Sequence, residues 1–379
     1  MRALSIGRTT ETWHQEFAKF CRRAPCTKGY EPEGSKLLHD TLFNVLQKDL
    51  RRLCIMQETK DPQLFPSEII LEVTNHCNLR CRHCHFHGNG AVRGRPLAHM
   101  PPAVWEMVLD EIAEWAQPVH ILTHGAGEPL LYPQLGDVLE KARRIPHAGV
   151  GFMTNGMLLS REWIDKLIDM QVHFVALSID GVDPESHDRF RRHARLKTIE
   201  ENVNFLIESK TKRRSRYPEL TFNMVAYPEI ESQKKDYVRR WIPHAQQVTV
   251  SKFRPIGSKR LWLRDEIVDH RPCPLLYNQC VIGVNGDIGL CCEDIHLEVV
   301  SGNVTNSRLL DIYNKSSILN RYRRLHENKK KDELYLCKEC DVWGGDMTIS
   351  HYNENIEGHD ITVNETYAYT SYVKNFPKK

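Results

Sequence analysis

Short apolar runs alternate with amphipathic stretches between residues 66 and 255. Runs rich in β-branched residues predict six strands, at 68–74, 119–123, 150–153, 174–179, 220–225 and 248–252. Apolar residues at helical spacing predict helices between them, at 102–116, 133–144, 160–170, 197–210 and 232–242. This alternation is typical of βα units around a parallel sheet, so we expect an α/β fold, a partial (βα)6 TIM-like barrel. Periodicity alone does not distinguish it from an open doubly wound sheet.

The regions on either side of this alternation have different patterns. Residues 38–53 carry leucine and valine at helical spacing, which predicts an N-terminal helical extension over residues 1–64. Beyond residue 257 the alternation ends, and glycine and cysteine occur at turns. We therefore expect a barrel over 65–264, a small second domain over 265–345 and a C-terminal tail over 346–379.

Composition and charge exclude several function classes. The chain has 379 residues, with 52 Lys and Arg against 49 Asp and Glu, a net charge of +3. This near balance gives no reason to expect nucleic acid or an anionic membrane as a partner. The first residues lack the apolar segment of a secretory signal, and no apolar run approaches the roughly 20 residues of a membrane-spanning helix. We expect a soluble, cytoplasmic protein.

The twelve cysteines are unevenly distributed. Three lie between Cys77 and Cys84, and six lie between Cys273 and Cys340. The cytosol keeps thiols reduced, so clustered cysteines in a cytoplasmic protein indicate metal ligands more than disulfides.

The most unusual residues follow the ends of predicted strands. In parallel α/β folds the ligand site lies beyond the carboxyl ends of the strands. The segments at those ends are Cys77 to Cys84, Gly125-Ala126-Gly127-Glu128-Pro129, Thr154-Asn155-Gly156 and Asp180-Gly181.

Cys77, Cys81 and Cys84 are spaced C-x3-C-x2-C on the loop after the first strand. Three thiolates without a nearby fourth would leave one iron of a four-iron cluster open to a chelating cofactor. The alternative is tetrahedral zinc, with a fourth ligand chosen from His76, His83, His85 and His87.

A C-x3-C-x2-C loop in this position resembles the signature of the radical SAM superfamily, over roughly residues 66–255. The residue before the last cysteine is usually aromatic in that family and is His83 here. The resemblance implies that Cys77, Cys81 and Cys84 hold a [4Fe–4S] cluster whose fourth iron is chelated by S-adenosylmethionine (SAM). Reductive cleavage of SAM then gives a 5′-deoxyadenosyl radical that abstracts a substrate hydrogen. It also implies a reductant such as flavodoxin or ferredoxin.

Further residues match SAM-contacting positions of that family. Gly125, Gly127, Glu128 and Pro129 resemble its segment ending in Gly-Glu-Pro, whose backbone and glutamate contact the SAM amino group. Ser178 and Asp180 match a strand position where a polar residue reaches the SAM carboxylate or ribose. We add Asn155 and Asn223 as SAM-binding candidates. For Asn223, a satisfied polar residue inside the barrel is an equal alternative.

A second cysteine set follows the barrel. Cys273, Cys291, Cys337 and Cys340 give C-x17-C, then 45 residues, then C-x2-C. The set resembles a SPASM domain, in the shortened "twitch" form because no cysteine follows Cys340, which implies one auxiliary [4Fe–4S] cluster. A zinc site of four cysteines is the alternative. Cys280 or Cys292 could replace Cys273 as a ligand.

A fully ligated auxiliary cluster suits electron transfer, so we expect a net oxidation at a carbinol or Cα carbon. The ligand spacing resembles that of the 2-deoxy-scyllo-inosamine dehydrogenase type, and this resemblance implies a carbinol of a sugar-like or aminocyclitol-like small molecule. The related neomycin C epimerase type quenches the substrate radical with a thiol, and Cys292 or Cys280 could be that donor.

Other interpretations remain open at this point. Peptide modification is one, and a non-catalytic zinc-binding protein is another. Two charged residues complete the candidates for catalysis: Arg254, which could contact SAM or an anionic substrate group, and Asp294, which could act on the substrate.

Overall fold

The computed structural model describes residues 63–254, 271–345 and 347–375. The predicted helical extension lies outside the described residues except for its last two positions, and so does the predicted boundary near residue 265. Within the described ranges, no helix has both the length and the apolar character that a membrane crossing requires.

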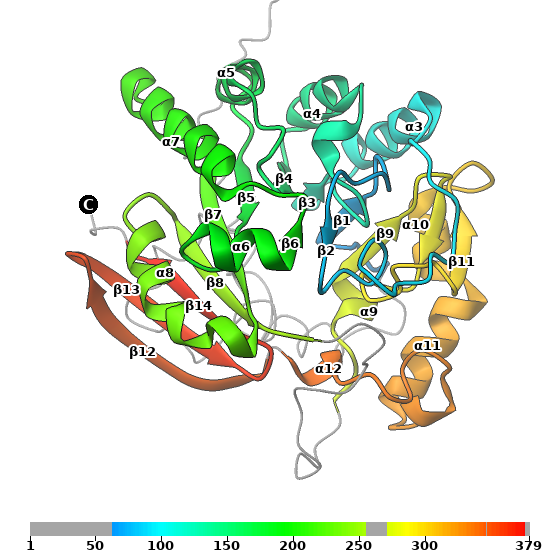
Figure 1. The fold of residues 1–379 in the computed structure, drawn as a ribbon. Coiled ribbons are helices and arrows are strands. Elements are labelled where there is room, and N and C mark those ends of the chain that lie inside the picture. The colour runs from blue at the N-terminus through cyan, green and yellow to red at the C-terminus, as the bar shows by residue number, and fades with distance from the viewer. Residues whose placement is uncertain (1–62, 255–270, 346, 376–379) are drawn as a thin grey trace, which may run out of the picture. The chain divides into compact units, whose positions relative to one another are not determined.

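Six neighbouring parallel strands form the centre of the fold (Figure 1). All six predicted strands are present, and the α/β partial barrel is confirmed. In spatial order they are β1 (Glu68–Leu71), β3 (Val119–Leu122), β4 (Ala148–Thr154), β5 (Phe174–Ser178), β7 (Glu219–Ala226) and β8 (Gln247–Lys252).

The five predicted helices lie around the outside of the strands (Figure 1). The five predicted helices are α3 (Pro102–Ala113), α4 (Leu135–Arg143), α5 (Arg161–Asp169), α7 (Leu196–Arg213) and α8 (Lys234–Trp241). The sequence analysis missed α6 (Pro184–Phe190) and the 3-10 turns η2 (Pro129–Leu131) and η3 (Pro228–Gln233). The start of α6 could have been predicted from the sequence Asp183-Pro184, which is typical of a helix N-terminus. In the structure Asp183 accepts the Ser186 N–H at 2.8 Å.

The region after the barrel joins the same sheet at the β1 edge. Strand β9 (Gln279–Ile282) pairs in parallel with β1, and β10 (Asp287–Gly289) and β11 (Val300–Asn303) follow as antiparallel strands. The remaining elements here are α9 (Leu275–Asn278), α10 (Leu309–Lys315), α11 (Ser317–Glu327), η4 (Lys331–Glu333) and α12 (Val342–Gly345).

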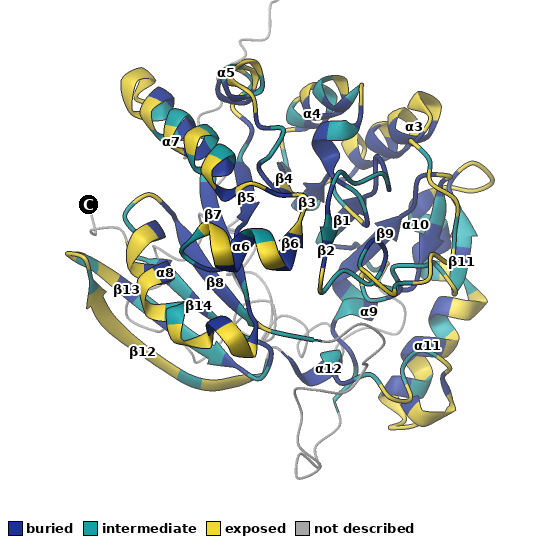
Figure 2. Cartoon of the chain, in the orientation of Figure 1, coloured by how far each residue is buried: buried dark blue, intermediate teal, exposed yellow. Residues whose placement is uncertain are grey.

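The segment expected to be a tail extends the sheet at the other edge. Strands β12 (Thr348–Ile356), β13 (His359–Thr366) and β14 (Tyr369–Lys374) form an antiparallel meander, and β14 pairs with β8. Ile361 and Val363 are fully buried, whereas β12 at the outer edge is mostly exposed (Figure 2). Residues 347–375, the described part of the expected tail, are therefore an ordered part of the sheet.

A separate two-stranded ladder lies beside the barrel. Strand β2 (Arg80–Cys81) pairs with β6 (Arg191–Arg192), so that Cys81 lies opposite Arg191. The backbone N–H of Arg82 also donates to the Phe190 carbonyl at 2.7 Å. This ladder attaches the first cysteine loop to the end of α6.

Candidate functional site

Backbone N–H groups surround the thiols of the first cysteine loop. Leu79 donates its N–H to Cys77 Sγ at 3.4 Å, and His87 donates to Cys84 Sγ at 3.2 Å. Burial raises the pKa of Cys77 to about 12 and that of Cys81 to about 11. Partly buried thiols with backbone donors fit an iron–sulfur cluster, whose iron ions displace the thiol protons and whose sulfurs accept hydrogen bonds.

The glycine-rich segment after β3 lies against this loop. Glu72 Oε1 accepts the Ala126 N–H at 2.8 Å, and a side chain at Gly125 would overlap Glu72. A Cβ at Gly127 would lie 2.3 Å from the Thr74 carbonyl oxygen. Only glycine at these two positions lets the segment approach the cysteine loop so closely.

Gly127→Ala is therefore expected to displace the segment and to weaken SAM binding by about tenfold or more, since tenfold corresponds to only ~1.4 kcal/mol. Equilibrium dialysis of SAM against anaerobically reconstituted protein measures the effect. Gly136→Ala in α4 is the matched control, because nothing lies within 4 Å of a Cβ there. Equal SAM affinity of the two variants would contradict the assignment.

Glu128 connects three loops at the carboxyl ends of the strands. Its carboxylate accepts the Thr154 hydroxyl at 2.7 Å and the Asn155 N–H at 2.8 Å, and its own N–H donates to the His76 carbonyl at 2.8 Å. Asn155 Nδ2 donates to Asn78 Oδ1 at 2.8 Å. Burial raises the pKa of Glu128 despite these donors. The predicted SAM-binding residues Glu128 and Asn155 are thus brought together with the cysteine loop.

Ser178 and Asn223 lie side by side in the sheet register. Val225 lines the pocket described below, and residues two apart on a strand share a face. Asn223, and Ser178 beside it, therefore face the interior of the barrel. Their contact with SAM stays a prediction.

Asp180 is occupied by a buried ion pair. Arg191 Nε lies 2.8 Å from Asp180 Oδ2, and the Val225 N–H donates to Oδ1 at 2.8 Å. Neither side chain is more than 7% exposed. Burial disfavours the charge, but the Arg191 guanidinium holds the pKa of Asp180 below its usual range. The carboxylate thus holds Arg191 beside Cys81 instead of pointing toward solvent or a pocket.

A second buried ion pair joins the first cysteine loop to the region after the barrel. Arg95 Nη2 donates to Glu72 Oε1 at 2.6 Å, and the same guanidinium donates to the Ile295 carbonyl at 3.0 and 3.1 Å. Arg95 also lies over the Phe86 ring, which stacks on His296. Since Glu72 holds the glycine-rich segment too, this cluster fixes three loops relative to one another.

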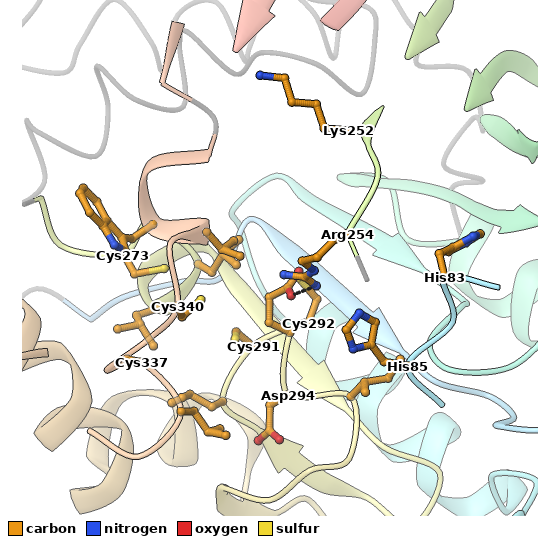
Figure 3. A pocket seen from close by; sticks show the side chains of 18 of the residues that line it. His83, His85, Lys252, Arg254, Cys273, Cys291, Cys292, Asp294, Cys337 and Cys340 are labelled. Carbon is orange, nitrogen blue, oxygen red and sulfur yellow. Dashed lines mark hydrogen bonds and ion pairs between the residues drawn. The ribbon is translucent and has the colours of Figure 1, made fainter. Parts of the chain in front are cut away.

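A cavity of about 540 Å³ extends from the first cysteine loop to the second cysteine set. Cys84 lines one end, flanked by His83 and His85. The other end is lined by the four cysteines of the predicted auxiliary site: Cys273, Cys291, Cys337 and Cys340. In Figure 3, Cys273, Cys337 and Cys340 lie on the left, and Cys291 lies between them and Cys292. Four thiols that line one cavity have the ligand chemistry of a second cluster, and the pocket reaches both candidate cluster sites.

The pocket separates the two remaining cysteine candidates. Cys292 is exposed in the pocket wall between Cys291 and Arg254 (Figure 3). Cys280 is 2% exposed on β9 and does not line the pocket. Its neighbour Gln279 accepts the Cys292 N–H at 2.9 Å, so strand alternation turns Cys280 to the opposite face. The structure does not bring Cys280 to the site.

Two charged candidates also line the pocket. Arg254 forms an ion pair with Glu293 (Figure 3). Asp294 accepts the N–H groups of Glu298 and Val299 at 2.8 and 3.0 Å, and burial raises its pKa. The Asp294 carboxylate therefore shapes its own loop, whereas Arg254 presents a guanidinium already paired with a carboxylate.

Several residues of the site were missed by sequence reasoning. Glu72, Arg95 and Arg191 act through partners that are distant in sequence, and no local spacing marks them. Lys252 lines the pocket. It could have been predicted from sequence, because it is the last residue of a predicted strand.

Comparisons with known proteins agree with this geometry. The family model of the radical SAM superfamily matches residues 71–239, and the SPASM model, an iron–sulfur cluster-binding domain, matches residues 273–341. The first domain implies a [4Fe–4S] cluster and SAM, and the second implies auxiliary iron–sulfur clusters, which favours iron over zinc at both cysteine sets.

Individual relatives cover the chain in part. The AdoMet-dependent heme synthase of Methanosarcina barkeri is 38% identical over 128 residues, 33% of this chain and 34% of that protein. The chain spans between a third and about a half of the length of the curated relatives that it matches.

Solved structures share the fold. BtrN in complex with AdoMet and 2-DOIA is 19% identical, covers 74% of this chain and 94% of its own, and has a TM-score of 0.52. Streptococcus suis SuiB bound to S-adenosylmethionine is 17% identical, with 78% and 76% covered and a TM-score of 0.58. The chain therefore contains a radical SAM domain over residues 71–239, followed by a SPASM domain over residues 273–341.

Proposed function

We propose that this radical SAM enzyme is an oxidoreductase that removes two hydrogens from a small organic molecule bound in the pocket. The observation that carries the proposal is the position of the pocket. It reaches Cys84 at one end and Cys273, Cys291, Cys337 and Cys340 at the other. A substrate bound there lies between a site that generates a radical and a site that accepts an electron.

The reaction is balanced as a two-electron oxidation. A cluster held by Cys77, Cys81 and Cys84 would supply the electron for SAM cleavage. A cluster held by Cys273, Cys291, Cys337 and Cys340 would accept the electron that remains after the substrate has lost one hydrogen atom to the 5′-deoxyadenosyl radical and one proton to solvent. The chain's own residues position the substrate and exclude water.

The pocket lining favours a substrate with a polar group at one side. Apolar side chains form much of the wall, and they exclude water from a reactive radical: Val225, Leu275, Leu276, Leu290, Leu336, Val342 and Trp343. Lys252 and the Arg254–Glu293 pair supply hydrogen-bonding and charged groups. A carbinol of a sugar-like or aminocyclitol-like molecule is the substrate class that we propose. The complex of the similarly folded BtrN with 2-DOIA supports it.

Epimerisation is the second candidate, and one observation favours it. The Cys292 side chain is exposed in the pocket, where its thiol could return a hydrogen atom to a substrate radical. That reaction leaves the mass of the substrate unchanged. Cys280 cannot replace it from its buried position on the far face of β9.

Anaerobic turnover in deuterated buffer tests both candidates. Reconstituted protein is incubated with SAM, a reductant and a panel of aminocyclitols and sugars, and 5′-deoxyadenosine and product mass are measured. We expect a product lighter by two hydrogens, formed in proportion to 5′-deoxyadenosine. A product of unchanged connectivity with one solvent deuterium, abolished by Cys292→Ala, would establish epimerisation instead. SAM cleavage that no small molecule in the panel accelerates, but that a peptide does, would contradict the proposed substrate class.

A further inference from the structure

His326 has a ring nitrogen that the described residues leave without a partner. It lies on α11, is 4% exposed, and lines the pocket together with the cysteines of the auxiliary site. Its Nδ1 accepts the backbone N–H of Cys273 at 3.3 Å. Its Nε2 is buried, and no hydrogen-bond partner for it exists among the described residues.

The Cys273 contact determines which ring nitrogen carries the proton. A nitrogen that accepts an N–H hydrogen bond has no proton of its own, so the proton of this imidazole is on Nε2. Nε2 is then a buried donor without an acceptor, which native structures rarely retain. The pocket beside it is where an acceptor would be found.

We propose that His326 Nε2–H donates a hydrogen bond to a sulfur of the auxiliary [4Fe–4S] cluster. Cluster sulfurs accept such bonds, and the bond stabilises the more negative, reduced cluster. His326 thus has two roles. Its Nδ1 positions the Cys273 backbone, and its Nε2–H donates to the cofactor.

Lys331 holds the cysteine loop on the same side. Its ammonium donates to the carbonyls of Cys337 and Lys338 at 3.4 and 3.3 Å, and it pairs with the Asp332 carboxylate at 3.6 Å. Because this charge is paired, the potential argument rests on His326 alone. Its hydrogen bond predicts a higher reduction potential than the cysteines alone would give, which suits the electron-accepting role proposed above.

The test uses the full chain with only the auxiliary cluster present. Cys77→Ala, Cys81→Ala and Cys84→Ala in one protein remove the first cluster, and the midpoint potential is then measured by EPR-monitored redox titration. His326→Leu is expected to lower the equilibrium constant for reduction about tenfold, which is ~59 mV for one electron. His326→Gln retains a carbonyl and an N–H, so its potential should lie between the two. An unchanged potential in His326→Leu would overturn the inference.

His187 provides a matched control. Its Nδ1 likewise accepts a backbone N–H, from Asp180 at 3.0 Å, and its buried Nε2 has no hydrogen-bond partner within residues 63–254, 271–345 and 347–375, but it does not line the pocket. His187→Leu should leave the potential unchanged.

A second measurement does not depend on whether the His326 variants assemble a cluster. ENDOR of the reduced auxiliary cluster, with His326 intact and histidine labelled with 15N, should show a solvent-exchangeable proton coupling and a weak histidine nitrogen coupling. Absence of both couplings would refute the hydrogen bond. Neither readout requires turnover. The hydrogen bond can therefore be refuted while the proposed oxidation stands, and the oxidation can be refuted while the hydrogen bond stands.

Discussion

Arg191→Met is expected to reduce the free energy of unfolding by about 3–5 kcal/mol, because Asp180 would keep a fully buried carboxylate without its counter-charge. Urea denaturation of the apoprotein under reducing conditions measures the change. The loss of stability should be accompanied by lower iron content at the first site, since Arg191 pairs with Cys81 across the β2–β6 ladder.

Arg192→Met is the control for this prediction, because Arg192 is the exposed neighbour on the same short strand. Combining Asp180→Asn with Arg191→Met should recover much of the stability, since both charges are then absent and the amide oxygen still accepts the Val225 N–H. The pKa of Asp180 is depressed in the folded chain. The difference between wild type and Arg191→Met should therefore shrink as the pH falls below the usual carboxyl range of about 4. Equal stability of the Arg191 and Arg192 variants would contradict the role of the pair.

Cys291→Ala is expected to remove the auxiliary cluster, whereas Cys292→Ala should leave it in place. The pocket places Cys291 with the other cysteines of the auxiliary set and Cys292 toward Arg254 (Figure 3). Iron analysis after anaerobic reconstitution should therefore fall from about eight to about four iron atoms per chain in Cys291→Ala and stay near eight in Cys292→Ala.

The two adjacent variants serve as controls for each other, since each removes one thiol from the same loop. If Cys292→Ala loses four iron atoms and Cys291→Ala does not, the ligand assignment is reversed, and the thiol proposed as a hydrogen donor is a cluster ligand. If neither variant loses iron, Cys273, Cys337 and Cys340 suffice without a ligand from this pair.

The strand and helix pattern of the barrel was predictable because parallel strands and their covering helices have strong, separate periodicities. Six strands and five helices were predicted in this way. The strands are β1, β3, β4, β5, β7 and β8. The sequence predicts that Ser178 contacts SAM only if its side chain points into the barrel. That orientation follows from the register of Ser178 with Asn223, which only the folded sheet shows.

Residues that act across long sequence separations were not predictable. Arg95 reaches both Glu72 and the Ile295 carbonyl, 200 residues away. The donor role of His326 depends on a contact with Cys273 that spans 53 residues. Polar side chains of this kind carry no local spacing signal, because their partners are set by the packing of the sheet and helices.

The meander β12–β14 was missed for a different reason. Its outer strand is exposed on both faces over most of its length, so the alternation that marks a half-buried strand is weak there. Its fully buried apolar positions, Ile361 and Val363, lie on the middle strand, and β14 adds Ser371 and Val373 as buried positions.

The hydrogen bonding of β9 to β1 and of β14 to β8 has a consequence for how this protein can be divided in the laboratory. Both outer strands of the barrel are covered by segments that come after residue 272. A shortened protein that ends after β8 would leave two unpaired strand edges in solution, one at each side of a hydrophobic sheet, and such edges promote self-association. The SPASM region produced alone would in turn lose the strand against which β9 forms. Dissection of the two redox centres is therefore better pursued by point substitution of their cysteines than by expression of separate fragments.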